Sequence, residues 1–116
     1  MKKTSIAIVI PVYNVENYVK QTLESIRNQL LEPDEVIIIN DGSTDGSAKI
    51  IEEYSNFKSW KIINQNNQGP GATRNLGRLI TKCEYTYFLD ADDIVKNDFV
   101  LRMQEIIKKY KKPDII

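Results

Sequence analysis

The regular alternation of short apolar runs with segments of helical spacing sets the strongest limit on how this sequence folds. The apolar runs cover residues 6–10, 36–39, 60–63 and 85–89. Their apolarity is continuous rather than alternating, which is typical of strands covered on both faces. Side chains with helical spacing follow each run: Val15, Val19, Thr22, Ile26 and Leu30; Ile50, Ile51 and Tyr54; Ala72, Leu76, Leu79, Ile80 and Cys83; Phe99, Val100, Met103, Ile106, Ile107 and Tyr110. The order β-α-β-α-β-α-β-α predicts an α/β fold with a mostly parallel sheet, right-handed crossovers and helices on both faces.

A sheet of this kind places its ligand crevice beyond the carboxyl ends of the strands, so functional residues are expected where the apolar runs end. The length of 116 residues suits a single core, and we interpret residues 1–116 as one domain. The last residues, 113–116, have the pattern of a further buried strand. We therefore expect a piece of a longer protein, cut as this element begins.

Composition excludes several kinds of chemistry. The chain has no histidine and one cysteine, Cys83, which excludes an internal disulfide, a Ser/His triad, a Cys/His pair and the usual zinc sites. Sixteen basic and sixteen acidic side chains cancel, so the long-range field expected of a nucleic-acid-binding protein is missing. Four lysines at 108, 109, 111 and 112 read as a solvated helix end. Any chemistry must then rely on carboxylates.

The first apolar stretch predicts a buried strand rather than a membrane segment. The uncharged run from Thr4 to Val15 is shorter than the ~20 residues of a membrane span, and Pro11 and Asn14 interrupt it. No small-residue cleavage site of a signal peptide follows. We expect a cytoplasmic protein with no transmembrane segment in this chain.

Aspartates gather where two of the predicted strands end. Asp41 follows the run 36–39 after one residue, and Asp90, Asp92 and Asp93 come directly after the run 85–89. Carboxylates held this close repel one another unless a cation or a proton intervenes. Oxygen ligands suit Mg²⁺ or Mn²⁺, which complete their coordination with water and phosphate oxygens. The pattern predicts a metal-assisted diphosphate site, although turn and capping roles explain any one of these residues equally well.

The stretch from Asn67 to Gly77 is rich in glycine but is not a dinucleotide fingerprint, because its sixth position from Gly69 is Arg74. Arg74 could reach an anionic or carbonyl-rich ligand, or form a surface salt bridge. Asn14 and Asp45 are plausible N-caps of the first and second helices, and Glu16 suits a first helical turn.

Four motifs in order resemble the family 2 glycosyltransferases of the Rossmann-like GT-A fold, a three-layer sandwich. They span residues 8–14, 36–45, 67–77 and 88–93, with the sequences IVIPVYN, VIIINDGSTD, NQGPGATRNLG and FLDADD. The resemblance implies a nucleotide-sugar donor, usually a UDP-sugar, and inversion at the anomeric carbon. It also implies that this chain is the amino-terminal, donor-binding half of a bacterial enzyme of polysaccharide biosynthesis, with a saccharide or lipid-linked acceptor and an expected place at the inner face of the membrane.

The resemblance also assigns roles to residues. Pro11, Val12 and Tyr13 would line the nucleoside pocket with Glu16 nearby, Asp41 would accept a hydrogen bond from the uracil imide, and Arg74 would support the base or the phosphates. Asp90, Ala91 and Asp92 would form the Asp-x-Asp element, in which Asp92 is the expected direct metal ligand and Asp90 a ligand of the metal or of the ribose. The bound ion would act as a Lewis acid on the leaving diphosphate.

The sequence departs from the family pattern at Asn40, where a second aspartate is common, and at Thr73, where alanine is frequent. The family's general base lies beyond the Asp-x-Asp element, so we expect it after Ile116 and expect this chain alone to bind donor without efficient transfer. Two alternatives stay open: a phosphatase of the haloacid dehalogenase type, with Asp90 as nucleophile, and a phosphoacceptor receiver domain.

Overall fold

The computed structural model describes residues 4–110. Its elements are β1 (Ile6–Val12), α1 (Val19–Arg27), β2 (Glu35–Asp41), α2 (Ser47–Glu52), β3 (Trp60–Gln65), α3 (Pro70–Ile80), β4 (Tyr85–Phe88) and α4 (Phe99–Lys109). The predicted order of strands and helices is confirmed. The strand expected at 113–116 and the lysines at 111 and 112 lie outside the described residues.

The four strands form one parallel sheet in the order β3-β2-β1-β4. The chain proceeds from β1 outward through β2 to β3 and then returns to the other side of β1 to form β4. The order therefore reverses between β1 and β4, and a crevice opens beside the carboxyl ends of strands at such a switch point.

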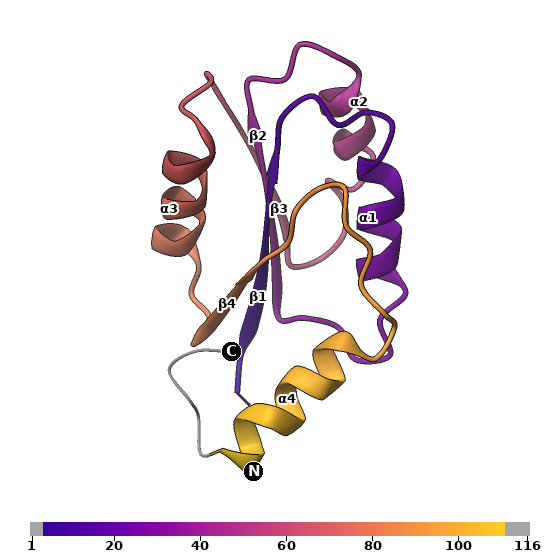
Figure 1. The fold of residues 1–116 in the computed structure, drawn as a ribbon, viewed down its shortest axis with the longest axis vertical. Coiled ribbons are helices and arrows are strands. Elements are labelled where there is room, and N and C mark those ends of the chain that lie inside the picture. The colour runs from indigo at the N-terminus through magenta and orange to yellow at the C-terminus, as the bar shows by residue number, and fades with distance from the viewer. Residues whose placement is uncertain (1–3, 111–116) are drawn as a thin grey trace.

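Helices cover both faces of the sheet, as predicted (Figure 1). Val9, Ile37 and Ile39 point to one face, where Leu76 and Ile80 of α3 pack on them. Ile8, Ile10 and Ile38 point to the opposite face, in one apolar cluster with Val19, Leu23 and Ile26 of α1, Ile51 of α2 and Val100 of α4. Alternation along each strand thus divides its side chains between two apolar layers.

Burial differs between the inner and outer strands. The apolar side chains of β1 and of the Val36–Ile39 run in β2 are almost all inaccessible, whereas every residue of β4 is only half-buried. The expectation of strands covered on both faces therefore holds for the two central strands and only partly for the edge strands. Five side chains with helical spacing are also exposed: Leu30, Ala72, Leu79, Ile106 and Tyr110. Among residues 4–110, no helix is long and apolar enough to cross a membrane.

Candidate functional site

An open cleft of about 590 Å³ lies at the carboxyl ends of β1, β2 and β4. This volume is within the range of small-molecule sites. It is lined by Pro11, Tyr13, Val15, Asp41, Asn67, Gly69, Pro70, Thr73, Arg74, Asp90, Ala91 and Asp92. The fold thus brings together seven of the nine residues expected from the sequence.

Val12 and Glu16 are the two expected residues that do not line the cleft. Val12 has an inaccessible side chain in the apolar core, because strand alternation turns it away from its neighbours Pro11 and Tyr13. Glu16 points to the next loop, where its Oε2 accepts a hydrogen bond from the backbone N–H of Gly46 at 2.8 Å.

The aspartates after β4 lie on a turn that alternates between core and solvent. Leu89 and Ala91 are buried, whereas Asp90, Asp92 and Asp93 are exposed. The turn is fixed to α1 by the Thr22 hydroxyl, which donates a buried hydrogen bond of 2.8 Å to the carbonyl of Ala91. Packing and this hydrogen bond therefore hold the three carboxylates outward.

Oxygen atoms of Asp90, Asp92 and Asp93 all lie within 4.8 Å of one another. Carboxylate oxygens at this spacing suit a hard divalent ion such as Mg²⁺ or Mn²⁺. Asp93 thus provides a third carboxylate beside the two expected metal ligands, Asp90 and Asp92. The sequence predicted no ligand role for Asp93.

Asp41 ends β2 and holds the segment that connects β3 to α3. Its Oδ1 accepts hydrogen bonds from the Gln65 amide at 2.9 Å and from the backbone N–H of Gln68 at 2.8 Å. Its Oδ2 accepts one from the backbone N–H of Gly69 at 3.1 Å. The carboxylate is 4% exposed and still borders the cleft.

The pKa of Asp41 reflects two opposing effects. Burial raises it, but the hydrogen bonds from Gln65, Gln68 and Gly69, together with the nearby Thr73 hydroxyl, favour the ionised form and hold the pKa of this carboxyl below its ordinary value of 3.8. Asp41 therefore carries a negative charge into the cleft at neutral pH.

Arg74, on α3, faces the acidic turn. Its Nη2 lies 3.5 Å from Oδ1 of Asp90, and both side chains are about half exposed. A pair this exposed contributes little to stability. The surface salt bridge, one of the two interpretations of Arg74 from the sequence, is present. Contact of Arg74 with an anionic ligand stays a prediction, and the residue lies in the cleft where such a ligand could be reached.

The loops after β1 and β2 are joined by reciprocal hydrogen bonds. Three successive backbone N–H groups, from Asn14 to Glu16, donate to the side chains of Ser43, Ser47 and Asp45. In return, Oδ1 of Asn14 accepts from the backbone N–H of Thr44 at 2.8 Å. This network, which we call the loop clasp, also includes the Glu16–Gly46 bond. It sets the position of Tyr13, which precedes Asn14 and is 50% exposed.

Three expectations about helix ends are wrong, because the residues concerned take part in the loop clasp instead. Asn14 does not cap α1, which begins at Val19 with Tyr18 before it, and Glu16 consequently lies outside the first helical turn. The residue before α2 is Gly46 rather than Asp45, although Oδ1 of Asp45 does accept a hydrogen bond from the backbone N–H of Ser47. Polar residues after a strand bond across to a neighbouring loop as readily as to the next helix.

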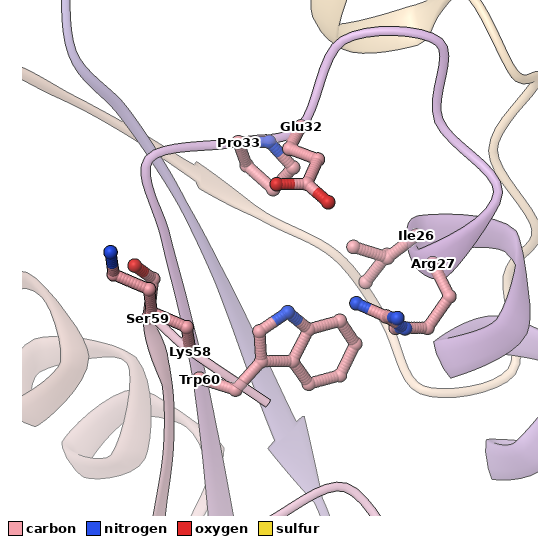
Figure 2. Close-up of a pocket in the computed structure, with 7 residues that line it drawn as sticks. All are labelled: Ile26, Arg27, Glu32, Pro33, Lys58, Ser59 and Trp60. Atoms are coloured by element: carbon pink, nitrogen blue, oxygen red, sulfur yellow. The ribbon is translucent and has the colours of Figure 1, made fainter. Parts of the chain in front are cut away.

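A second hollow, of about 70 Å³, lies at the opposite end of the sheet. Figure 2 shows the Trp60 ring beside Arg27, with Glu32 and Pro33 across from it. The Arg27 guanidinium is already placed over the Phe57 ring, 3.6 Å from its centroid. This hollow is much smaller than the cleft and lies away from the carboxyl ends of the strands, so we do not assign it a function.

Five residues of the cleft were not selected from the sequence: Val15, Asn67, Gly69, Pro70 and Thr73. Four of them belong to the glycine-rich stretch 67–77, which the sequence had singled out but from which only Arg74 was chosen. Thr73 is inaccessible, and its hydroxyl donates to the carbonyl of Gly69 at 2.7 Å. The signal was present in the motif, whereas the individual contacts depend on the fold.

Comparison with known proteins identifies the family. A family model described as glycosyl transferase family 2 matches residues 7–115. The chain belongs to this family. Glycosyltransferase relatives include the putative glycosyltransferase EpsH of Bacillus subtilis, 41% identical over 104 residues, which cover 89% of this chain and 30% of EpsH. A poly(ribitol-phosphate) beta-glucosyltransferase of Bacillus spizizenii is 38% identical over 109 residues, which cover 90% of this chain and 17% of that protein.

Two solved structures share the fold. S. aureus TarS 1–349 in complex with UDP-GlcNAc is similar with a TM-score of 0.84 and 28% identity, over 92% of this chain and 32% of that one. The mannosyltransferase PcManGT from Pyrobaculum calidifontis, in complex with GDP-Man and Mn²⁺, has a TM-score of 0.76 at 18% identity, which shows the fold alone. The GT-A-like α/β fold expected from the resemblance is confirmed. This family 2 chain spans about a third or less of the relatives named here, and the comparisons give no support to a phosphatase or a receiver domain.

Proposed function

We propose that the cleft binds the nucleoside diphosphate part of a sugar donor, a UDP-sugar, through a divalent metal ion. The observation that carries this proposal is that one cleft contains both the buried carboxylate of Asp41 and the acidic turn of Asp90 and Asp92. A base and a diphosphate need different partners, and these two groups supply them at separate places in one site. The complex of the similar TarS structure with UDP-GlcNAc supports the choice of donor.

The nucleoside end of the proposed site lies beside Pro11, Tyr13 and Asp41. The exposed Tyr13 ring offers an apolar face to a base or ribose, and the loop clasp holds it in place. The ionised Asp41 accepts an N–H from the base, the role expected from the family resemblance. The fully buried Val12 supports this end only from the core side.

The diphosphate end lies beside Arg74, Asp90 and Asp92. Three carboxylates and one guanidinium line the cleft, so a diphosphate would be repelled without an added cation. Asp92, with Asp90 or Asp93, would hold Mg²⁺ or Mn²⁺, and Asp90 can alternatively contact the ribose. A bound ion supplies Lewis-acid stabilisation of the charge that develops on the leaving diphosphate. Arg74 supplies a further positive charge on the same side.

The complete reaction belongs to the same proposal. Transfer to an acceptor hydroxyl, with inversion at the anomeric carbon, requires a general base that we expect beyond residue 116. We propose that residues 1–116 form the donor-binding part of a longer cytoplasmic enzyme, at the inner face of the membrane, with a saccharide or lipid-linked acceptor. The share of the relatives' length that this chain covers supports this proposal.

Isothermal titration calorimetry with UDP tests the donor site and the metal separately. We expect UDP to bind the chain at least about tenfold more tightly with Mn²⁺ than with a chelator, and Asp92→Asn to remove most of this gain. Glu105→Gln, an equivalent change on the exposed side of α4, is the control and should leave the affinity unchanged. Absence of UDP binding in the presence of Mn²⁺ contradicts the donor site. A UDP affinity that changes neither with Mn²⁺ nor with Asp92→Asn contradicts only the metal assignment.

A further inference from the structure

The hydrogen bonds around Asp41 limit what a ligand can offer to this carboxylate. A carboxylate has about four acceptor positions on its two oxygens. Among residues 4–110, Gln65 and Gln68 donate to Oδ1, and Gly69 donates to Oδ2. The Thr73 hydroxyl lies close enough to Asp41 to help lower its pKa, but its one proton is donated to the carbonyl of Gly69 at 2.7 Å, so it does not take a fourth position. One acceptor position, on Oδ2, is left for a ligand.

Gln65 is the only one of these three donors that uses its side chain. Its amide nitrogen donates to Oδ1 of Asp41 at 2.9 Å and to the Thr73 hydroxyl at 3.2 Å, so both of its N–H groups are engaged. The other two donors are backbone groups of the segment before α3. Gln65 therefore decides, through its side chain alone, whether Oδ1 is closed or open to a ligand.

We infer that Gln65 is a specificity-determining residue that restricts the site to bases presenting a single N–H to Asp41. This inference rests on the proposed function, because it assumes that a base is read by Asp41. Uracil presents one ring N–H between two carbonyl groups. Guanine presents two neighbouring N–H donors, which pair best with both oxygens of a carboxylate, and cytosine presents an acceptor nitrogen that the carboxylate repels.

The physical basis of the selection is the cost of an unpaired donor. Asp41 is almost fully buried, so a second N–H brought against the occupied Oδ1 finds neither water nor a free lone pair. Sites of this kind discriminate strongly against ligands whose polar groups are left unpaired. With Gln65 replaced by an apolar side chain, Oδ1 regains an acceptor position and the penalty on a second donor disappears.

Hypoxanthine separates this effect from the size of the base, because it is guanine without the 2-amino group and presents one ring N–H. We therefore compare UDP, IDP and GDP by isothermal titration calorimetry in Mn²⁺ buffer. For the wild-type chain we expect UDP to bind most tightly and IDP to bind about tenfold more tightly than GDP. For Gln65→Leu we expect this preference for IDP over GDP to fall to about one.

Gln21→Leu is the matched control, since Gln21 is an exposed residue of α1 away from the cleft and should keep the wild-type preference. If the wild-type chain binds UDP but binds IDP and GDP with equal affinity, the inference is overturned and the donor site stays intact. An undiminished preference in folded Gln65→Leu also overturns it. Absence of UDP binding to the wild-type chain contradicts the proposed function itself. The wild-type comparison needs no substitution, so it can overturn the inference even where circular dichroism shows that Gln65→Leu is unfolded.

Discussion

Glu16 and Gly46 are joined across two loops by a 2.8 Å hydrogen bond from the backbone N–H of Gly46 to Oε2 of Glu16. An added Cβ at Gly46 would lie too close to the same carboxylate oxygen, so the flexible end of the Glu16 side chain would have to move. The present geometry of the pair therefore combines an acceptor at position 16 with a residue that has no Cβ at position 46. It is one of the bonds that hold the Tyr13 loop against the loop after β2.

We expect Gly46→Ala to lower the free energy of unfolding by less than about 1 kcal/mol, because the flexible Glu16 side chain can move away at the loss of one exposed hydrogen bond. In a Glu16→Ala background there is no carboxylate to displace, so the same substitution should cost much less. Urea unfolding of the two single variants and the double variant measures this coupling. If the losses in free energy of unfolding are additive, the effect of Gly46→Ala does not depend on the Glu16 carboxylate.

Asp41 should make stability depend on pH in the acid range. Its pKa in the folded chain is lowered from 3.8, so its contribution is complete above about pH 5 and is lost as the pH falls through the folded pKa. At neutral pH, Asp41→Asn should cost about 1–3 kcal/mol, because the amide cannot accept all of the hydrogen bonds that the carboxylate accepts.

Urea unfolding at several pH values tests the direction in which the Asp41 contribution to stability changes with pH. The difference in stability between the wild-type chain and Asp41→Asn should shrink between about pH 5 and pH 3. A difference that stays constant over this range would mean that the Asp41 carboxyl has the same pKa in the folded and unfolded states.

Arg74 should influence metal binding more than folding. It lies 3.5 Å from Asp90 in an exposed pair, so Arg74→Ala should change the free energy of unfolding by less than about 0.5 kcal/mol. Loss of the guanidinium removes a competitor for the carboxylate, so Mn²⁺ alone should bind more tightly. UDP should bind more weakly with Mn²⁺ saturating, because a positive charge near the diphosphate is gone.

Electron paramagnetic resonance of free Mn²⁺ and calorimetry with UDP give the two affinities. Arg78→Ala is the control, since Arg78 lies one turn further along α3 and pairs with Asn75 instead. Weaker Mn²⁺ binding in Arg74→Ala would contradict the assignment of Asp90 to the metal site.

Two glycines of α3 should respond oppositely to alanine. A Cβ at Gly77 would collide with the side chain of Val9 on β1, whereas a Cβ at Gly71 would meet no atom within 4 Å. Gly77→Ala should therefore destabilise by about 1–3 kcal/mol through overpacking. Gly71→Ala should be neutral or stabilising by up to about 1 kcal/mol, because alanine favours the helix. Thermal unfolding followed by circular dichroism compares them, and equal effects would show that α3 and β1 can separate without cost.

The order of strands and helices could be predicted from the sequence because apolar runs and helical spacing are local patterns. Continuous apolar runs predicted strands at 6–10 and 36–39. In the structure these strands are slightly longer, Ile6–Val12 and Glu35–Asp41. Helical spacing predicted four helices but overestimated their burial, as exposed Leu79 shows, because periodicity does not indicate how wide a face the sheet covers. Aspartates after strand ends predicted the cleft because parallel strands bring their carboxyl ends to one edge.

Amino-acid order alone therefore determined which elements form, in which direction the strands run and which carboxylates reach the crevice. Only the folded chain decided the partners of those groups: Asn14 and Glu16 bond to a loop about 30 residues away, and Asp41 is surrounded by donors from residues 65–69. Backbone propensity and apolar periodicity act over a few neighbouring residues. Hydrogen bonds between loops depend on sheet register and loop geometry, which exist only after distant segments have packed together.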